Sequence, residues 1–378
     1  MAVAQVAKAS SLVLLAAGGT GGHLFPAEAL AEALARRGVT VDLATDNRAE
    51  RYGKKFPARH IHVIASATVR GRDPVSLART ATMLGVGTLQ AIRLLGRIKP
   101  AAVVGFGGYP TVPPVLASTL KRIPTLIHEQ NAVMGRANKL LAPRVRAIAT
   151  TFDGVLDRDQ KLRSKATRTG NPVRPAVIAA AAVPYDVPEM AGALRLVVFG
   201  GSQGARIMSD IVPPAIERLD PHLHMRLAIV QQAREEDVAR VKEIYARVKV
   251  KAEVAPFFTD LPMRIAASHL VIARSGASTV AELAAIGRPA ILVPLPHALD
   301  QDQMANAAVL EQAGGALRLR QEEFSPDRLA AEISALASAP QKLVAMAAAA
   351  RSQGALDAAE RLADLVLRVA GMAKAASV

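Results

Sequence analysis

The sequence predicts an α/β protein with two doubly wound domains, each a parallel β-sheet covered by helices on both faces. Three observations predict this class. The chain has 378 residues, a length that suits two domains. Short, apolar, β-branched runs alternate with helical stretches along most of it. The order of strand, glycine-rich loop and helix begins twice, at Gly18-Gly19 and at Gly200-Gly201.

The first half follows this order closely. Leu12–Ala17 has the composition of a buried strand, and the glycine-rich loop Gly18–His23 leads from it into a helix that Pro26 opens. The helix runs to Arg37, and Gly38 ends it. Four more strands are expected, at Val39–Thr45, Ala101–Phe106, Thr125–His128 and Arg146–Thr150.

The second half starts a new series after an alanine- and proline-rich stretch, which we expect to be a linker over residues 176–194. Domains are therefore expected at residues 1–175 and 195–354. Residues 355–378 should form a C-terminal helix that can return to the first domain. The expected strands of this half are Arg195–Phe199, Met225–Val230, Leu270–Ala273 and Ala290–Val293, and a helix is expected at Ala205–Leu219.

Composition excludes several classes of protein. Cysteine is absent, which excludes disulfides, thiolate zinc sites and cysteine nucleophiles. Residues 1–175 hold 26 Lys and Arg against 10 Asp and Glu, whereas residues 176–378 hold 21 against 22. The basic half predicts a polyanionic partner: nucleic acid, an anionic membrane surface or a phosphorylated substrate. Aromatic residues make up only 3% of the chain, so no nucleic-acid partner is expected.

One uncharged run bears on the membrane alternative. Thr80–Ile92 carries no charge and is flanked by Arg79 and Arg93. It is shorter than the roughly 18–20 residues that cross a bilayer, and no other stretch reaches that length. The run suits a helix that lies on a membrane surface, and it suits a core-facing helix equally well.

The two glycine loops admit different chemistries. Residues 18–23 read GGTGGH, which lets the backbone and a helix N-terminus approach an anion. They do not form the dinucleotide fingerprint, because Leu24 stands where it needs glycine, although Asp42 and Asp46 keep a cofactor alternative open. Residues 200–204 contain G-x-S-x-G, so a serine hydrolase through Ser202 is the rival class. Its acid and base would be Asp260 with His269 or His297.

Polar residues gather at the expected carboxyl ends of strands, where parallel sheets bind ligands. In the first domain these are His23, Tyr109, Glu129 and Asn131. In the second domain the segment Arg274–Glu282 places serine and threonine at a helix start, where they cap the helix or bind phosphate.

Six motifs occur in order and at fitting spacing, and together they closely resemble the MurG family of peptidoglycan N-acetylglucosaminyltransferases. The resemblance covers about Leu12 to Ala370. The motifs are Gly18–His23, Gly107–Tyr109, His128–Asn131, Gly170–Arg174, Gly200–Ala205 and Arg274–Glu282.

The resemblance implies a GT-B fold, with two Rossmann-like domains facing a central cleft. It implies an inverting transfer of N-acetylglucosamine from UDP-N-acetylglucosamine to lipid I, which forms lipid II. The C-terminal domain would hold the nucleotide sugar. The N-terminal domain would hold the acceptor and touch the anionic cytoplasmic face of the inner membrane, as a peripheral protein. Contacts with other cell-wall synthesis proteins also fit this assignment.

The resemblance also implies roles for individual residues. In the first domain, Thr20, Gly21 and Gly22 would face the reacting sugar and the diphosphates, and Asn131 would bind a donor-sugar hydroxyl. The diphosphate of the donor would contact Arg174 and Ser202, and a phosphate would also contact Ala277, Ser278 and Thr279. Phe258 would contact the uracil and Glu282 the ribose. Gln303 would contact the sugar, and Gln301 is the alternative for that role.

For the chemistry, His23 is the first candidate for the general base, because an imidazole titrates near neutral pH. Glu129 is the second candidate, as the base or as the group that orients His23. Helix N-termini and Arg174 would stabilise the leaving diphosphate, so no metal cofactor is expected. Two D-x-D spacings, at 157–159 and 300–302, keep a metal–nucleotide alternative open.

The basic region Arg70–Lys99 would hold the anionic leaflet and the diphosphate of the acceptor. Five apolar residues of this region are expected to dip into the membrane interface: Met83, Leu84, Val86, Leu89 and Leu94.

Overall fold

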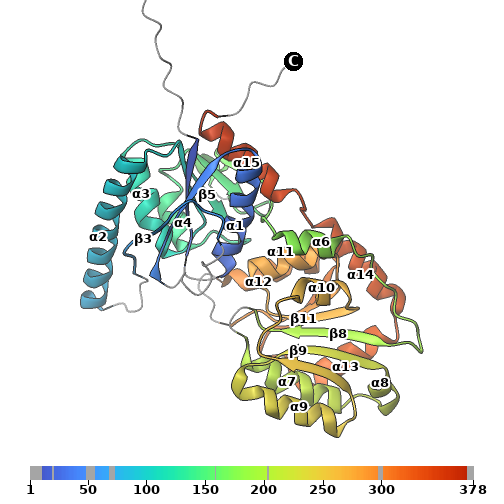
Figure 1. The fold of residues 1–378 in the computed structure, drawn as a ribbon. Helices are drawn as coiled ribbons and strands as arrows, with labels where there is room; N and C mark the ends of the chain where they lie inside the picture. Colours follow the sequence, from blue (N-terminus) through green and yellow to red (C-terminus); the bar gives the residue numbers. More distant parts are fainter. Residues whose placement is uncertain are drawn as a thin grey trace, which may run out of the picture. The chain divides into compact units, whose positions relative to one another are not determined.

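The computed structural model describes residues 11–18, 21–47, 56–67, 73–157, 159–201, 204–296 and 301–372. The chain forms two compact units. Unit 1 comprises Met1–Pro172 and Asp357–Val378, and unit 2 comprises Val173–Leu356. Each unit is a parallel β-sheet with helices on both faces (Figure 1), so the predicted α/β class with two doubly wound domains is confirmed.

The sheet of unit 1 has the order β3-β2-β1-β4-β5-β6-β7, and all of its pairs are parallel. Its central strand β1 is fully buried, and successive side chains enter the cores on opposite faces of the sheet. The seven strands are β1 Leu12–Ala16, β2 Thr40–Thr45, β3 Ile61–Val63, β4 Ala102–Gly105, β5 Thr125–Glu129, β6 Ala147–Thr150 and β7 Ala166–Arg168.

Helices cover both faces of this sheet. One core is shared by α1 and α15, and the other by α2, α3 and α4. The helices of unit 1 are α1 Gly21–Arg36, α2 Pro74–Ile98, the 3₁₀ helix η3 Tyr109–Thr111, α3 Val112–Leu120, α4 Arg136–Leu141, α5 Gln160–Arg163 and α15 Ala358–Val369.

Unit 2 repeats the plan with a six-stranded parallel sheet of order β10-β9-β8-β11-β12-β13. Its strands are β8 Leu194–Phe199, β9 Leu227–Gln232, β10 Lys251–Ala255, β11 Leu270–Ala273, β12 Ala290–Leu292 and β13 Ala316–Arg318. Its helices are α6 Pro175–Ala181, α7 Arg206–Glu217, α8 Pro221–Arg226, η4 Glu235–Asp237, α9 Val238–Arg247, α10 Leu261–Ala266, α11 Ala277–Ile286, α12 Asp302–Ala313, α13 Pro326–Ala337 and α14 Pro340–Ser352.

The strands that the sequence did not predict lie mainly at the sheet edges. β3, β7 and β10 are exposed or half-buried along most of their length, so they lack the apolar run that marks a buried strand. The strand expected from Met225 was placed too early. Met225 lies in α8, which Asp220 caps and Pro221 opens, and its side chain is 77% exposed.

The expected linker is partly helical. Its first residues lie in α6, which packs against α10 and α11 within unit 2. Arg351 donates to the carbonyl of Ala181, and Arg288 donates to those of Val183 and Pro184. These bonds fix the segment after α6 to unit 2, so the interpretation of residues 176–194 as an independent linker was wrong for this part.

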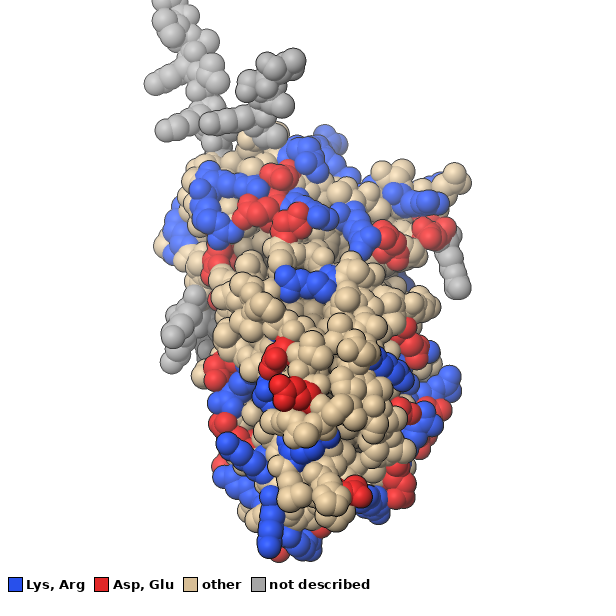
Figure 2. Space-filling view, turned by 90° about the vertical axis from the view of Figure 1, so that its right-hand side faces the viewer, with Lys and Arg blue, Asp and Glu red and all other residues tan. Residues whose placement is uncertain are grey.

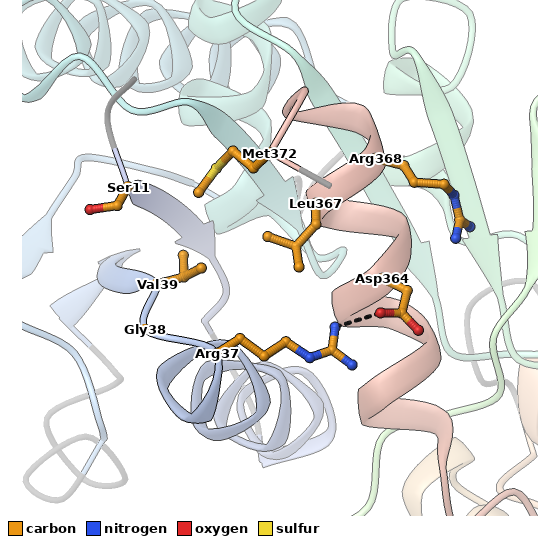
Figure 3. A pocket seen from close by; sticks show the side chains of 8 residues that line it. All are labelled: Ser11, Arg37, Gly38, Val39, Asp364, Leu367, Arg368 and Met372. Carbon is orange, nitrogen blue, oxygen red and sulfur yellow. Dashed lines mark ion pairs between the residues drawn. The ribbon is translucent and has the colours of Figure 1, made fainter. Parts of the chain in front are cut away.

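The C-terminal helix α15 belongs to unit 1 and packs against α1. Glu360 of α15 pairs with Arg36 at 2.5 Å and with Arg37 at 2.7 Å. Figure 3 shows the neighbouring Arg37–Asp364 pair at the edge of a pocket that Val39 and Leu367 also line. Ion pairs and apolar contacts therefore join the last helix to the first.

The charges on the surface and the length of the helices bear on whether the protein contacts or crosses a membrane. The face in Figure 2 mixes Lys and Arg with Asp and Glu over its surface. Among the described helices, no single one is long and apolar enough to cross a membrane. Only α13 and α14 reach that composition as a pair, and they bend by 97° where they meet.

Candidate active site

The first glycine loop and the loop after β4 meet around His23 in unit 1. His23 lies in the first turn of α1 and is half-buried. Gly107 and Gly108 both have positive φ, and a Cβ on Gly108 would lie 3.2 Å from the Nε2 atom of His23. Glycine is therefore needed here for the backbone conformation and for close approach to the imidazole. Gly21 and Gly22 lie in the same turn, whereas Thr20 lies outside the described residues.

Glu129 is buried, and donors occupy both of its carboxylate oxygens. The backbone N–H and the side-chain amide of Asn131 donate to Oε1 at 3.0 and 3.2 Å. The N–H of Gly135 and the amide of Asn138 donate to Oε2 at 2.9 and 2.8 Å. Burial raises the pKa of Glu129, and these donors oppose that rise. The carboxylate thus binds the loop from β5 to α4 and holds Asn131 in place.

Gln130, the residue that follows Glu129, contacts His23. Its Oε1 atom lies 3.3 Å from Nδ1 of His23, and its Nε2 atom lies 3.1 Å from Nδ1 of His128. The sequence prediction that Glu129 orients His23 does not agree with these contacts. The signal that could have identified Gln130 is strand alternation, which places residues 128 and 130 on one side and residue 129 on the other.

In unit 2, α11 begins at the end of β11 with an uncapped N-terminus. Its N-cap residue is Gly276, which makes no side-chain cap hydrogen bond. Ala277, Ser278 and Thr279 form the first turn and are half-buried. The Oγ atom of Ser278 is buried and has no hydrogen-bond partner among the described residues. A helix start with unused N–H groups and a buried hydroxyl is suited to a phosphate.

Arg174 and Glu282, which the sequence assigns to different parts of the donor, contact each other in unit 2. The Nη2 atom of Arg174 lies 3.2 Å from Oε1 of Glu282. Burial raises the pKa of Glu282, while the charge of Arg174 and its hydrogen bond lower it. The structure therefore places a cation and a buried carboxylate together, with Arg174 at the start of α6 and Glu282 on α11.

The alternatives Gln301 and Gln303 lie in different surroundings. Gln303 accepts a hydrogen bond from the N–H of Leu295 at its side-chain oxygen, and its backbone carbonyl accepts one from Ser275. Gln301 is exposed and precedes α12 with a left-handed φ of 52°. Gln303 is thus held beside the loop that leads into α11, and its role in donor binding stays a prediction.

The aromatic pair at the end of β10 differs in exposure. Phe258, the predicted uracil contact, is 8% exposed, and the guanidinium carbon of Arg264 lies 4.4 Å from its ring centroid. Its neighbour Phe257 is 66% exposed, which the sequence did not single out. The role of Phe258 stays a prediction.

Several alternatives lose support from side-chain contacts. Asp42, the cofactor candidate, is fully buried and accepts two hydrogen bonds from Arg59, both at 3.0 Å. His62 lies a further 3.0 Å from the same carboxylate. A carboxylate committed to these partners is not available to a ribose.

Among the described residues, the hydrolase alternative has no assembled acid and base. Nδ1 of His269 accepts the backbone N–H of Arg195, and Asp260 pairs with Arg264, so Asp260 does not orient His269. Ser202, His297 and Asp300 lie outside the described residues. Asp159 caps α5 through Leu162. In the part of the chain that the structure describes, no group of three or more His, Asp or Glu could hold a metal ion.

Comparisons with known proteins agree with this arrangement. Residues 13–150 match the glycosyltransferase family 28 N-terminal domain, and residues 195–362 match its C-terminal domain. The chain is 64% identical to the UDP-N-acetylglucosamine--N-acetylmuramyl-(pentapeptide) pyrophosphoryl-undecaprenol N-acetylglucosamine transferase of Rhodopseudomonas palustris (strain BisB18), over 97% of this chain and 98% of that protein. The enzyme of the same name from Nitrobacter hamburgensis is 62% identical, over 95% and 97%.

Two solved structures extend the comparison to the fold. The crystal structure of Acinetobacter baumannii MurG has a TM-score of 0.77 and 30% identity, covering 94% of this chain and 99% of that one. The glycotransferase of kitacinnamycin has a TM-score of 0.68 and 17% identity, covering 95% and 98%. With two parallel-sheet units, these likenesses confirm the expected GT-B fold class.

Proposed function

Since the chain belongs to glycosyltransferase family 28, we propose that it transfers N-acetylglucosamine from UDP-N-acetylglucosamine to lipid I. Lipid I is the undecaprenyl-diphosphate-linked muramyl-pentapeptide, and the product, lipid II, serves peptidoglycan synthesis. The name of the Rhodopseudomonas palustris relative, which is 64% identical to this chain, supports both substrates.

The observation that carries the proposal is the uncapped start of α11. A UDP-sugar brings two phosphates, which need N–H donors and positive charge. The first turn of α11 supplies the N–H groups, and the buried Ser278 hydroxyl supplies a further donor. Glu282 lies one turn along the same helix, where a carboxylate suits the vicinal hydroxyls of a ribose. Unit 2 is accordingly the donor-binding unit.

The acceptor reacts at His23 of unit 1. Its imidazole accepts the proton of the acceptor hydroxyl while the new bond to the anomeric carbon forms and the bond to the UDP oxygen breaks. The electron pair of the broken bond leaves with UDP. The α11 N-terminus and Arg174 stabilise the diphosphate as its charge grows. Attack on the face opposite to the leaving group inverts the anomeric carbon and gives a β-1,4 linkage.

We further propose that no divalent ion is required, because protein groups already supply the positive charge that a metal–diphosphate would need. Turnover measured with excess EDTA should stay within about 2-fold of turnover in Mg²⁺. If a metal ion did contact the diphosphate, its removal would lower turnover by more than about 2-fold. A loss of 100-fold or more that Mg²⁺ restores would contradict the proposal.

A membrane-facing role is proposed for α2, which lies at the outer edge of unit 1 beside α3 (Figure 1). One face of α2 is buried and includes Ala91, Leu94 and Leu95. Leu94 is only 7% exposed, so it cannot enter a membrane as expected, whereas Leu84 is half-buried against the same core. Val75, Val86 and Leu89 are exposed on the opposite face, and Leu77 and Met83 are also exposed on this helix.

Cations share this exposed face. Arg79, Arg93 and Arg97 are exposed along the same helix. Apolar side chains that enter the interface and arginines that contact anionic headgroups would dock α2 on the leaflet that holds lipid I. This is a peripheral contact, on the cytoplasmic side where the nucleotide sugar is made available.

Vesicle co-sedimentation tests the docking of α2. Wild-type protein should bind vesicles that contain phosphatidylglycerol more strongly than pure phosphatidylcholine, and less strongly as salt rises. The double variant Val86→Ser/Leu89→Ser should bind several-fold less. Met225→Ser in unit 2 is the control, because it removes an even more exposed apolar side chain elsewhere. Binding unaffected by salt and by the α2 variant would contradict the proposal.

The reaction itself is tested by incubating the protein with UDP-N-acetylglucosamine and a lipid I analogue. We expect one UDP released for each sugar added to the analogue. Equal transfer to an undecaprenyl-diphosphate lipid without the muramyl-pentapeptide would support a transferase with another lipid acceptor instead. Covalent labelling of Ser202 by a fluorophosphonate, without sugar transfer, would support the hydrolase.

A further inference from the structure

A chain of buried polar side chains runs behind His23. His128 is fully buried at the end of β5, and Gln130 is 2% exposed just beyond it. The carbonyl oxygen of Gly170 lies 3.0 Å from Nε2 of His128. Nδ1 of His128 lies 3.1 Å from Nε2 of Gln130, and Oε1 of Gln130 lies 3.3 Å from Nδ1 of His23. The proposed function uses only its last member.

Two backbone carbonyls determine the direction of every hydrogen bond in this chain. A carbonyl oxygen can only accept, so Nε2 of His128 must carry the proton that it donates to Gly170. Nδ1 of a neutral His128 is then an acceptor, and the group facing it must be the NH₂ of Gln130. The carbonyl of His128, 3.3 Å from the same nitrogen, requires an NH₂ there independently. The amide of Gln130 thus has one permitted orientation.

This orientation turns the side-chain oxygen of Gln130 toward Nδ1 of His23. An amide oxygen cannot donate, so Nδ1 of His23 must carry the hydrogen. We propose that Gln130 is a positioning residue that holds His23 in the Nδ1–H tautomer, so that Nε2 is the nitrogen that accepts the proton of the sugar acceptor. The catalytic part of this inference depends on the proposed transfer reaction, whereas the tautomer does not.

The surroundings support the neutral state that the direction of the chain requires. Burial and, to a smaller extent, the nearby His23 lower the pKa of His128 to about 4, so His128 is neutral at pH 7. The ring of Phe106 lies beside it, with ring centroids 5.6 Å apart. A neutral His128 cannot donate through both nitrogens, which keeps the direction of the chain fixed.

The loop after β4 supports the choice of Nε2. A Cβ on Gly108 would lie 3.2 Å from Nε2 of His23, on the side of the imidazole away from Gln130. Glycine at this position therefore leaves room beside Nε2. In the reaction, the acceptor O–H bond breaks, its proton moves to Nε2, and the oxygen bonds to the anomeric carbon as UDP leaves. The resulting imidazolium keeps its Nδ1–H bond to Gln130.

An amide sets the tautomer without adding charge. A carboxylate at position 130 would also accept from Nδ1, but it would raise the pKa of His23 and keep the base protonated near neutral pH. Glutamine therefore orients the imidazole without placing a negative charge beside it. A residue at position 130 with a purely structural role would not show this difference between an amide and a carboxylate.

The experiment uses protein with ¹⁵N-labelled histidine, whose eight imidazoles give NMR shifts that distinguish the two tautomers. His23→Asn identifies the signals of His23 by difference. Wild type should show His23 as Nδ1–H. Gln130→Leu should show a mixture of tautomers, with kcat lowered about 10- to 100-fold and the KM for UDP-N-acetylglucosamine within 2-fold. Gln130→Glu should keep the Nδ1–H tautomer and move the acid limb of the pH–rate profile upward.

Gln231→Leu is the matched control, because Gln231 is a fully buried glutamine at the end of β9 in unit 2 and is bonded to Tyr245 and Met208. It should leave the tautomer of His23 and the pH profile unchanged. An Nε2–H tautomer in the wild type would overturn the inference, and so would Gln130→Leu and Gln130→Glu variants with wild-type pH profiles. If wild-type protein transfers no sugar yet shows the Nδ1–H tautomer, the proposed function fails and the positioning role of Gln130 stands.

Discussion

The candidate sites of the two units satisfy their buried polar groups in different ways. In unit 1, Glu129 accepts four hydrogen bonds, and Gln130 joins His128 to His23 through protein atoms alone. In unit 2, the hydroxyl of Ser278 is buried without a partner among the described residues, and α11 starts without a side-chain cap. The carboxylate of Glu129 is thus satisfied within the protein, although Oδ1 of Asn138 beside it has no partner among the described residues, whereas the hydroxyl of Ser278 is a donor that a ligand can satisfy.

This difference matches what each unit contributes to the reaction. A general base must be held in one orientation and one tautomer before the substrate arrives, which requires partners within the protein. A binding site for phosphate gains affinity from donors that lack protein partners, because an unsatisfied buried donor is costly until the ligand satisfies it. Arg174 and Glu282 of unit 2 differ from Ser278 in this respect, because they pair with each other.

The largest effect should come from His23→Ala, which removes the proposed base from the site in unit 1. We expect kcat to fall about 10²- to 10⁴-fold with little change in the KM for the donor, because the imidazole acts on the acceptor proton. His222→Ala, on an exposed residue of α8, is the control. Turnover near the wild-type rate would show that another group is the base.

Glu129→Gln tests whether the carboxylate of unit 1 is structural. An NH₂ group would replace one oxygen and face donors from Asn138 and Gly135, or from Asn131. The free energy of unfolding should fall by about 2–4 kcal/mol, as measured by urea denaturation. Unchanged stability with a large loss of kcat would instead return Glu129 to the role of base.

Acid should destabilise the chain through its buried histidines. Burial lowers the folded-state pKa of His128 to about 4, so between pH 6.5 and 4 the unfolded chain binds a proton that the folded chain does not. Stability therefore falls as the pH falls through this window, by about 1.4 kcal/mol per pH unit. Urea unfolding at pH 7 and pH 5 should show a loss of about 2 kcal/mol from this group.

The variant His128→Gln tests whether His128 causes this acid sensitivity. Its free energy of unfolding should fall less between pH 7 and pH 5 than that of the wild type. In unit 2, burial also lowers the pKa of His269 to about 4, so His269 adds an effect of the same sign. An equal loss in wild type and His128→Gln would show that His128 is not the responsible group.

The smallest change should come from Ser278→Ala in unit 2. Removing the hydroxyl should raise the KM for UDP-N-acetylglucosamine about 10-fold, roughly the value of one hydrogen bond to a charged phosphate. The free energy of unfolding should stay the same or rise, because a buried hydroxyl without a partner is lost. Ser209→Ala is the matched control, with a buried and equally unpartnered hydroxyl on α7. If both variants raise the KM equally, Ser278 has no specific role.

Much of the fold could be predicted because local signals were strong. Central strands such as β1 and β11 are continuous apolar runs, and glycine loops follow β1 and β8 where parallel sheets bind ligands. The edge strands β3 and β7 could not be predicted, since a strand with little burial has no apolar pattern. The helix α6 was hidden in a proline-rich stretch whose contacts with α10 and α11 are distant in sequence.

The sequence by itself determined the α/β class, the two series of strands and the strand ends at which His23, Glu129 and Glu282 lie, because periodicity and glycine loops are local properties. Only the tertiary structure decided which neighbour orients His23, since Glu129 and Gln130 differ by the side of the chain on which each lies. It also decided that Leu94 faces a core and Leu89 faces outward, because an amphipathic pattern does not say what covers each face.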